Sequence, residues 1–142
     1  MFKPLAIVSL SVVLPLLPSA HAGRQTAAEA KRQNQYDDRI GYGDNAFNEV
    51  FRAAARVDVR KPIREYEAYV LASAYLFSQV SLCGRAYLPT RRGDVWVAET
   101  TVGYPPSAGR PIYIDARTGI TYAAGFPRIV NPKKYLKSLQ NI

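Results

Sequence analysis

The stretch VWVAETTVGYPPSAGRPIYIDARTGITYAAG, Val95 to Gly125, decides the fold class of this 142-residue chain. Within it, β-branched and aromatic residues recur in three runs that Gly- and Pro-containing segments separate, which predicts strands joined by turns. The predicted strands cover 95–102, 111–115 and 120–125, with a loop at 104–110 and a tight hairpin turn at 116–119. A shorter strand at 85–90 precedes them. The stretch therefore predicts an antiparallel sheet of three to four strands.

Helical periodicity dominates the chain before this sheet. One predicted helix covers 46–57 and is capped by Asp44 or Asn45. A longer one begins at Pro62, is apolar on most sides in its middle, and has Gly84 as its C-cap. A short final helix is predicted near the C-terminus. Because the helices come first and the antiparallel strands follow, the fold class is α+β, with N-terminal helices packed on a curved sheet.

The first 22 residues have the three parts of a secretory signal peptide. Lys3 is the positive start, an apolar run follows at 5–17, and Ala20-His21-Ala22 is the pattern that signal peptidase reads. The run is shorter than the about 20 residues of a membrane span. We therefore expect cleavage after Ala22, a periplasmic protein and no membrane span; an uncleaved anchor is the alternative. The mature chain would have an N-terminal arm and loop, 23–45, and a single α+β domain, 46–142. Residues 23–34 have helix propensity but no wide apolar stripe, which indicates a frayed helix or a mobile arm, and residues 35–45 are predicted as loop.

Few residues of the mature chain offer reactive chemistry. His21 is the only histidine and leaves with the signal peptide, so the commonest general base and the commonest transition-metal ligand are both missing. Cys83 is the only cysteine, and we expect it to be a small core residue at the end of a helix. Histidine-dependent triads and zinc sites are therefore excluded. The sequence predicts a non-catalytic protein with no cofactor and no metal.

Trp96, the only tryptophan, lies in the predicted strand 95–102. We expect it to anchor the sheet on the central helix, because a lone tryptophan among valines is usually buried. The alternative is a ligand platform, with Glu99 as a carboxylate in a pocket between helix and sheet. Trp96 and Glu99 are thus the candidate core or pocket residues.

Arginines gather around the predicted loops of the sheet. The candidate partner-binding residues are Arg85, Arg91, Arg92, Tyr104 and Arg110. The formal charge of +8 becomes +7 without Lys3, which favours an acidic partner surface. A solvated basic face is the ordinary alternative, and anionic lipid or glycan surfaces stay open. No nucleic-acid partner is expected, because an exported chain rarely meets nucleic acid and no readout motif is present.

The run from Ala68 to Gly125 also carries a family pattern. Its motif residues, in chain order, are Cys83-Gly84, Pro89, Asp94-Val95-Trp96, Thr100 or Thr101, and the strand pair IYIDARTGITY. This pattern resembles the NTF2-fold immunity proteins encoded beside bacterial polymorphic toxins. Two positions depart from the family: Glu99 stands where a glycine is usual, and SAGR contains only Gly109 in place of paired glycines. The last strand pair also resembles PepSY modules through its Asp-x-x-Thr-Gly turn.

The immunity resemblance implies a cone-shaped α+β domain with no reaction of its own. Such a protein binds a cognate secreted toxin and blocks or distorts its active site, and an exported one would meet the toxin in the periplasm. The alternative is a periplasmic small-ligand-binding or accessory module of NTF2-like or PepSY-like type, which would use a pocket containing Glu99. The sequence assigns no oligomeric state.

Overall fold

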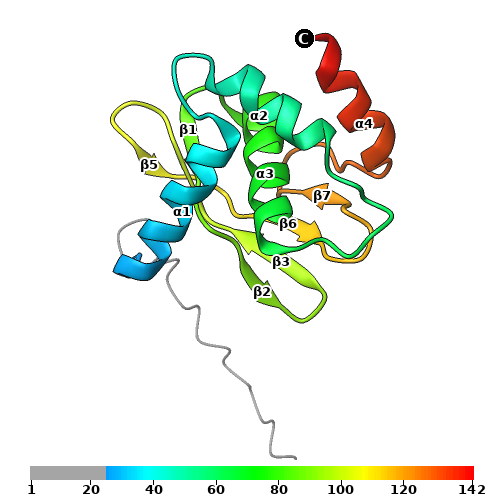
Figure 1. Cartoon of the computed structure of the whole chain (residues 1–142), viewed down its shortest axis with the longest axis horizontal. Helices are drawn as coiled ribbons and strands as arrows, with labels where there is room; N and C mark the ends of the chain where they lie inside the picture. The colour runs from blue at the N-terminus through cyan, green and yellow to red at the C-terminus, as the bar shows by residue number, and fades with distance from the viewer. Residues whose placement is uncertain (1–24) are drawn as a thin grey trace, which may run out of the picture.

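The structure, a computed structural model, describes residues 25–142, and the predicted signal peptide lies outside the described residues. The helices of this part are α1 (Ala27–Ile40), α2 (Ala46–Ala55), α3 (Glu65–Tyr75) and α4 (Pro132–Ser138); the π-helical turn η1 (Leu76–Val80) continues α3 and the 3-10 turn η2 (Leu139–Asn141) continues α4. Three helices precede all the strands, and every strand pair is antiparallel (Figure 1). The predicted α+β class is confirmed.

The strands form two antiparallel sheets. The three-stranded sheet has the order β1-β4-β5 and contains β1 (Gly84–Ala86), β4 (Thr100–Val102) and β5 (Ser107–Ala108). The four-stranded sheet has the order β2-β3-β6-β7 and contains β2 (Thr90–Arg92), β3 (Val95–Ala98), β6 (Ile112–Asp115) and β7 (Thr121–Tyr122). The chain passes between the sheets from β1 to β2, from β3 to β4 and from β5 to β6, so they are the two parts of one bent meander.

The bend divides the predicted strand 95–102 at Glu99. Between the pairing of β1 with β4 and that of β2 with β3, residues 87–89 oppose only Ala98 and Glu99, which makes a bulge with one extra residue. The Tyr87 N–H still donates to the Glu99 carbonyl at 2.9 Å. The extra residue turns the hairpin and re-aims the side chains beyond it.

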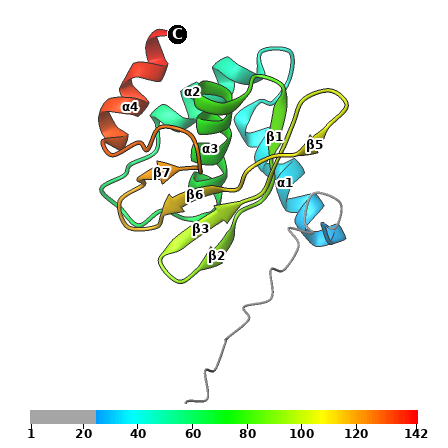
Figure 2. The ribbon, with the colours of Figure 1, turned by 180° about the vertical axis from the view of Figure 1, so that it is seen from behind.

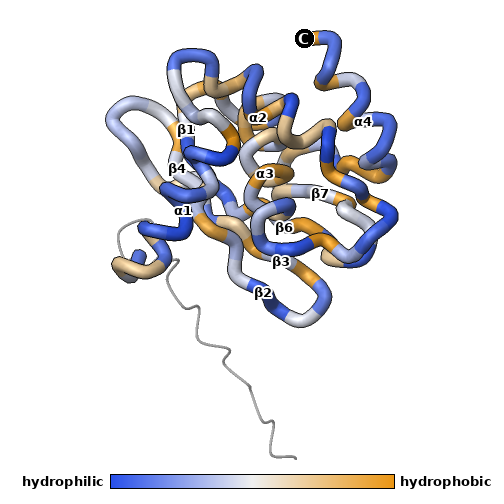
Figure 3. The backbone as a smooth tube through the Cα atoms, in the orientation of Figure 1, coloured by the Kyte–Doolittle hydropathy of each residue, from blue (hydrophilic) through white to orange (hydrophobic). Residues whose placement is uncertain are grey.

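The central helix α3 lies between α2 and the sheet. All of its residues from Ala68 to Tyr75 are buried, as expected for a helix that is apolar on most sides. The largest fully buried side chains around it include Val50, Tyr69, Tyr75, Ile112 and Ile114. The apolar stretches of β3 and β6 lie beside α3 (Figure 3). The helices cover one face of the four-stranded sheet, and its other face is turned to the viewer in Figure 2.

Helix α1 agrees with the helical alternative for residues 23–34 and corrects the loop predicted from residue 35 onward. Its start is a capping box, in which the Thr26 hydroxyl accepts from the Glu29 N–H at 3.2 Å and the Glu29 carboxylate accepts from the Thr26 N–H at 2.9 Å. Gly41, at φ 83°, ends the helix in the left-handed conformation that favours glycine. Residues 35–40, predicted as loop, are the last turns of this helix.

α1 is docked by polar contacts, which explains why the apolar pattern did not predict its packing on the domain. Gln33 is only 2% exposed. Its side-chain oxygen accepts from the Leu88 N–H at 3.3 Å, and its amide donates to the Ala86 carbonyl at 3.4 Å. Both backbone groups flank the bulge, so α1 satisfies polar groups that the bent hairpin leaves unpaired.

Three further predictions near the central helix were wrong. α3 begins at Glu65 rather than Pro62, because the Ile63 N–H instead donates to the β6–β7 turn at 2.7 Å. Gly84 is the first residue of β1 rather than a helix C-cap. Cys83 is exposed in the turn that follows η1, where its N–H donates to the Ser81 hydroxyl, and so it is not a core residue.

The final helix is confirmed. The Asn131 side chain accepts from the Lys134 N–H at 3.0 Å and caps α4, while Leu136 and Leu139 are buried. Within residues 25–142, none of the helices combines the length and apolar character that a membrane crossing requires.

Candidate functional site

Arg85 lies in a polar network between α1 and α3. Its guanidinium forms an ion pair with Asp37 of α1, and the Tyr69 hydroxyl donates to the same carboxylate at 2.6 Å. Tyr69 is 1% exposed, and the Asp37 side chain retains only 15% exposure. The Tyr42 ring lies 5.8 Å from the guanidinium. Arg85 is thus paired within the chain, although its side chain retains 40% exposure, and it helps to hold α1 on the domain.

The burial of tyrosine hydroxyls, here and at α4, makes stability sensitive to alkaline pH. Burial raises the pKa of Tyr42 and of Tyr135 to about 12, and it raises that of Tyr69 still further, with the bond to Asp37 adding to the effect. Tyrosine in the unfolded chain has a pKa of about 10. The stabilisation is therefore complete below about pH 10 and is lost as the pH rises toward the folded-state values.

We expect the free energy of unfolding to fall by roughly 4 kcal/mol between about pH 9 and about pH 11, because each of the three tyrosines contributes about 1.3 kcal/mol when it ionises only in the unfolded chain. Urea denaturation across this range measures the fall, and phenolate absorbance reports ionisation. Tyr69→Phe removes one shifted group and should flatten the dependence, whereas Tyr104→Phe, at a residue 96% exposed, should leave it unchanged. Equal slopes for the two variants would contradict the assignment.

Arg91 and Trp96 lie opposite each other on β2 and β3. The indole N–H of Trp96 donates to the Ile63 carbonyl at 2.8 Å, and the ring packs against the buried core. The Arg91 guanidinium lies 5.4 Å from the ring centre, and its Nε donates to the Gly93 carbonyl. These contacts favour the anchor interpretation of Trp96, since they join β3 to the chain that leads into α3.

The structure does not bring the five predicted partner-binding residues together. Arg91 and Arg92 flank the β2–β3 hairpin turn at one end of the segment 95–102, whereas Tyr104 lies beyond its other end, in the β4–β5 hairpin (Figure 1). At about 3.3 Å per residue, this segment is on the order of 20 Å long. Arg110 lies elsewhere again, in the bend before β6, and donates to the carbonyl of Ala124 at 3.1 Å.

A compact arginine–tyrosine cluster lies instead on the face of the four-stranded sheet that no helix covers. Tyr113 pairs with Val97 on one side and with Tyr122 on the other, so the three side chains form a row across β3, β6 and β7. The two tyrosine rings stack, with centroids 5.2 Å apart and planes at 16°. The Arg128 guanidinium lies 4.5 Å from the Tyr122 ring centre. We call this side of the four-stranded sheet, which carries Val97, Tyr113 and Tyr122, the outer face (Figure 2).

The charge around the outer face is mixed: Arg92 shares a shallow cavity with Val97 and with the carboxylates Glu29 and Glu99, whereas Arg128 lies at the other side of the row. Arg92 follows two residues after Thr90, the partner of Val97, and so it lies on this face; both Arg92 and Arg128 are exposed. Asp115 is the acidic residue of β6 here. Burial raises the pKa of its carboxyl, but the N–H groups of Arg117 and Thr118, each at 2.9 Å, lower it overall. That carboxylate is ionised and committed to the β6–β7 turn.

Tyr113, Tyr122 and Arg128 are not among the site residues predicted from the sequence, although the hairpin turn that pairs the two tyrosines was predicted. A turn at 116–119 places residues 115 and 120 opposite each other, and counting outward pairs Tyr113 with Tyr122. The alternation of the strand then places both rings on one face. No sequence pattern predicts the contact of Arg128 with Tyr122, because Arg128 lies in an irregular segment after β7.

The predicted pocket between helix and sheet is occupied by side chains. Tyr69, Tyr75 and Leu76 fill the space against Ile112 and Ile114. Glu99 lies elsewhere, at the bulge, and lines a shallow cavity of about 40 Å³ that it shares with Gln25, Glu29 and Arg92 among others. The structure therefore separates Trp96 from Glu99, and Glu99 lacks the deep cavity that a ligand-binding carboxylate would need.

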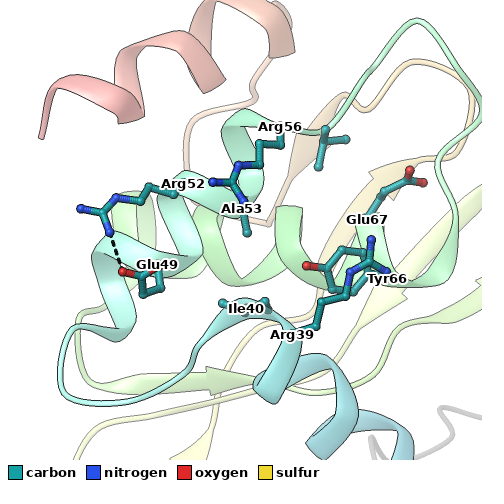
Figure 4. Close-up of a pocket in the computed structure, with 9 residues that line it drawn as sticks. Arg39, Ile40, Glu49, Arg52, Ala53, Arg56, Tyr66 and Glu67 are labelled. Carbon is teal, nitrogen blue, oxygen red and sulfur yellow. Dashed lines mark hydrogen bonds and ion pairs between the residues drawn. The ribbon is translucent and has the colours of Figure 1, made fainter.

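A larger pocket opens on the helix side of the molecule, between α1, α2 and the start of α3 (Figure 4). Its volume is about 310 Å³. The Arg39 guanidinium lies 3.8 Å from the Tyr66 ring centre, and Arg52 forms an ion pair with Glu49 at 2.5 Å. Arg56 also lines the pocket, beside Ala53. This pocket presents arginines, an aromatic ring and carboxylates, but it contains no nucleophile paired with a base.

Across residues 25–142, no cluster of three or more His, Cys, Asp and Glu side chains is placed to hold a metal ion. Comparisons of the chain with protein-family models, with curated proteins and with solved structures found no match. The resemblance to immunity proteins therefore stays a prediction that rests on the motif residues, and the site is argued from its own geometry.

Proposed function

We propose that this protein is an exported, non-catalytic binding protein that uses its outer face to hold an acidic surface of another protein. Its partner in this proposal is a cognate secreted toxin, which it neutralises in the periplasm. The observation that carries the proposal is the stacked pair Tyr113–Tyr122 with Arg128 against it, on a sheet face that no helix covers.

The chemistry of this row suits protein recognition. Tyrosine and arginine are enriched at binding hot spots, because a rigid ring buries a large area and a guanidinium offers several donors. Stacking between Tyr113 and Tyr122 restrains both rings before a partner arrives, which lowers the entropic cost of binding. Arg128, which lies against Tyr122 at the β7 side of the row, favours a carboxylate on the partner and speeds its approach.

The test is co-expression of the exported chain with the toxin-like C-terminal domain of a large secreted protein encoded beside it. Cell survival and co-purification of a one-to-one complex are the expected results. Tyr113→Ala and Arg128→Ala should each raise the Kd at least about tenfold, as loss of a central hot-spot residue does. Added salt should weaken the complex, because charged groups contribute to it.

Two controls separate recognition from folding. Tyr113→Phe keeps the stacked ring and should bind within about twofold of the parent chain, and Lys31→Ala, an exposed residue of α1, should have no effect. Thermal denaturation of each variant shows that it is folded. Survival without a complex, or equal affinity for Tyr113→Ala and Lys31→Ala, would overturn the proposed site; the absence of both rescue and complex would overturn the toxin–inhibitor function.

A further inference from the structure

A second surface, on the helix side, differs from the outer face in position and chemistry. The pocket of Figure 4 adjoins a second pocket of about 470 Å³, which lies between the α2–α3 connection and α4. Arg56 and Val57 line both pockets and so form their common wall. We call the two adjoining pockets the Arg56 groove.

The acidic residues of the groove are already engaged within the chain. Asp58 accepts from Arg60 at 2.8 and 3.1 Å, and this bonding to Arg60 lowers the pKa of its carboxyl to about 2. Glu49 pairs with Arg52, and Glu67 accepts from the Arg64 N–H at 2.6 Å at the start of α3. These carboxylates therefore already hold partners within the chain.

The remaining basic residues of the groove have no such partner. Within residues 25–142, Arg39, Arg56, Lys133 and Lys137 take part in no ion pair. Arg56, Lys133 and Lys137 surround the larger pocket, and Arg39 and Arg56 lie around the smaller one. The imbalance extends along the chain, because the C-terminal segment 116–142 contains no Asp or Glu. The groove therefore presents uncompensated positive charge on both sides of Arg56.

The larger pocket also has an apolar lining. Ala55, Val57, Val59 and Leu136 line it beside the basic side chains. A ligand that matches both features carries negative charges together with an apolar group. Apolar contact with the floor would drive burial, and the carboxylates would meet the guanidinium and ammonium groups at the rim.

We propose that the Arg56 groove binds an acidic peptide segment that carries apolar side chains. Two pockets that share one wall suit an extended chain, with an apolar side chain in the larger pocket and carboxylates at Arg56 and at Lys133 and Lys137. The lining of the larger pocket contains no aromatic ring on which a nucleobase would stack, and the ring in the smaller pocket, Tyr66, is covered by Arg39. The basic groups line hollows, which a flat lipid surface fills less well than a peptide.

The experiment is fluorescence anisotropy with a labelled dodecapeptide of four Asp-Glu-Leu repeats and the exported chain. We expect saturable binding that weakens with added salt. Arg56→Gln should raise the Kd roughly five- to tenfold, the effect of losing one charge-assisted contact, and Lys133→Gln combined with Lys137→Gln should do the same. Arg117→Gln is the matched control, because Arg117 is an exposed arginine in the β6–β7 turn whose guanidinium pairs with Asp94 at 3.0 Å.

Control peptides and other anionic ligands test the choice of occupant. A peptide with Asn-Gln-Leu repeats should not bind, and one with Asp-Glu-Ser repeats should bind several-fold more weakly. Equal binding of the serine peptide would overturn the apolar part of the assignment. Tighter binding of inorganic polyphosphate or of phosphatidylglycerol vesicles would overturn the choice of occupant. No anisotropy change up to about 1 mM protein, or an equal effect of Arg56→Gln and Arg117→Gln, would overturn the site itself.

Discussion

Replacing Asp37 by alanine is expected to lower the free energy of unfolding by about 4 kcal/mol, because it leaves a partly buried guanidinium and a buried hydroxyl without their shared acceptor. The Arg85 ion pair and the 2.6 Å bond from Tyr69 both end on this one carboxylate. Through them α1 is joined to β1 and α3. The variant therefore removes a contact on which the docking of a whole helix depends.

Asp38→Ala is the matched control for this prediction. Asp38 is the next residue of the same helix, it is exposed, and its side chain takes part in no hydrogen bond or ion pair among the described residues. Its replacement should change the free energy of unfolding by less than about 0.5 kcal/mol. Urea denaturation measures the free energy of unfolding of both variants. Similar small losses of stability would show that the contacts of Asp37 with Arg85 and Tyr69 contribute little. Tyr69→Phe should cost about 1 to 2 kcal/mol, since it removes only one of the two bonds.

Replacing Trp96 by alanine is expected to cost about 3 kcal/mol. The ring packs on the core, and its N–H holds the Ile63 carbonyl at 2.8 Å. Loss of both the packed area and the hydrogen bond should loosen β3 from the segment that leads into α3. Trp96→Phe keeps part of the packing and should cost about half as much.

This variant also separates the two interpretations of Trp96. An anchor predicts a large loss of stability with little direct effect on a partner, whereas a ligand platform predicts nearly unchanged stability. Tyr104→Ala is the reference for an aromatic residue that supports nothing, because Tyr104 is 96% exposed, and its cost should stay under about 0.5 kcal/mol. Thermal and urea denaturation measure all three variants. A stability of Trp96→Ala equal to that of Tyr104→Ala would overturn the anchor.

The candidate site was predicted from the sequence only in part. Arginine and tyrosine near the sheet were predicted as the residue types that contact a partner. The prediction grouped Arg91 and Tyr104 as one patch, however, although they lie at the two ends of a bent hairpin. Proximity along the chain does not give proximity in space once a bulge at Glu99 turns the strands. The cluster on the outer face depends on cross-strand register instead, which joins Val97, Tyr113 and Tyr122.

The sequence by itself determined the α+β class, the buried central helix, the β6–β7 hairpin and the capped final helix. Each of these depends on local signals: period, turn residues and caps. The tertiary structure alone decided the docking of α1, whose buried face consists largely of polar side chains that find partners on distant strands. It alone decided that Arg85 pairs with Asp37, and that Arg56 lies between two pockets. These features depend on contacts between residues far apart in the chain, and no local pattern of polarity specifies which polar group will meet which.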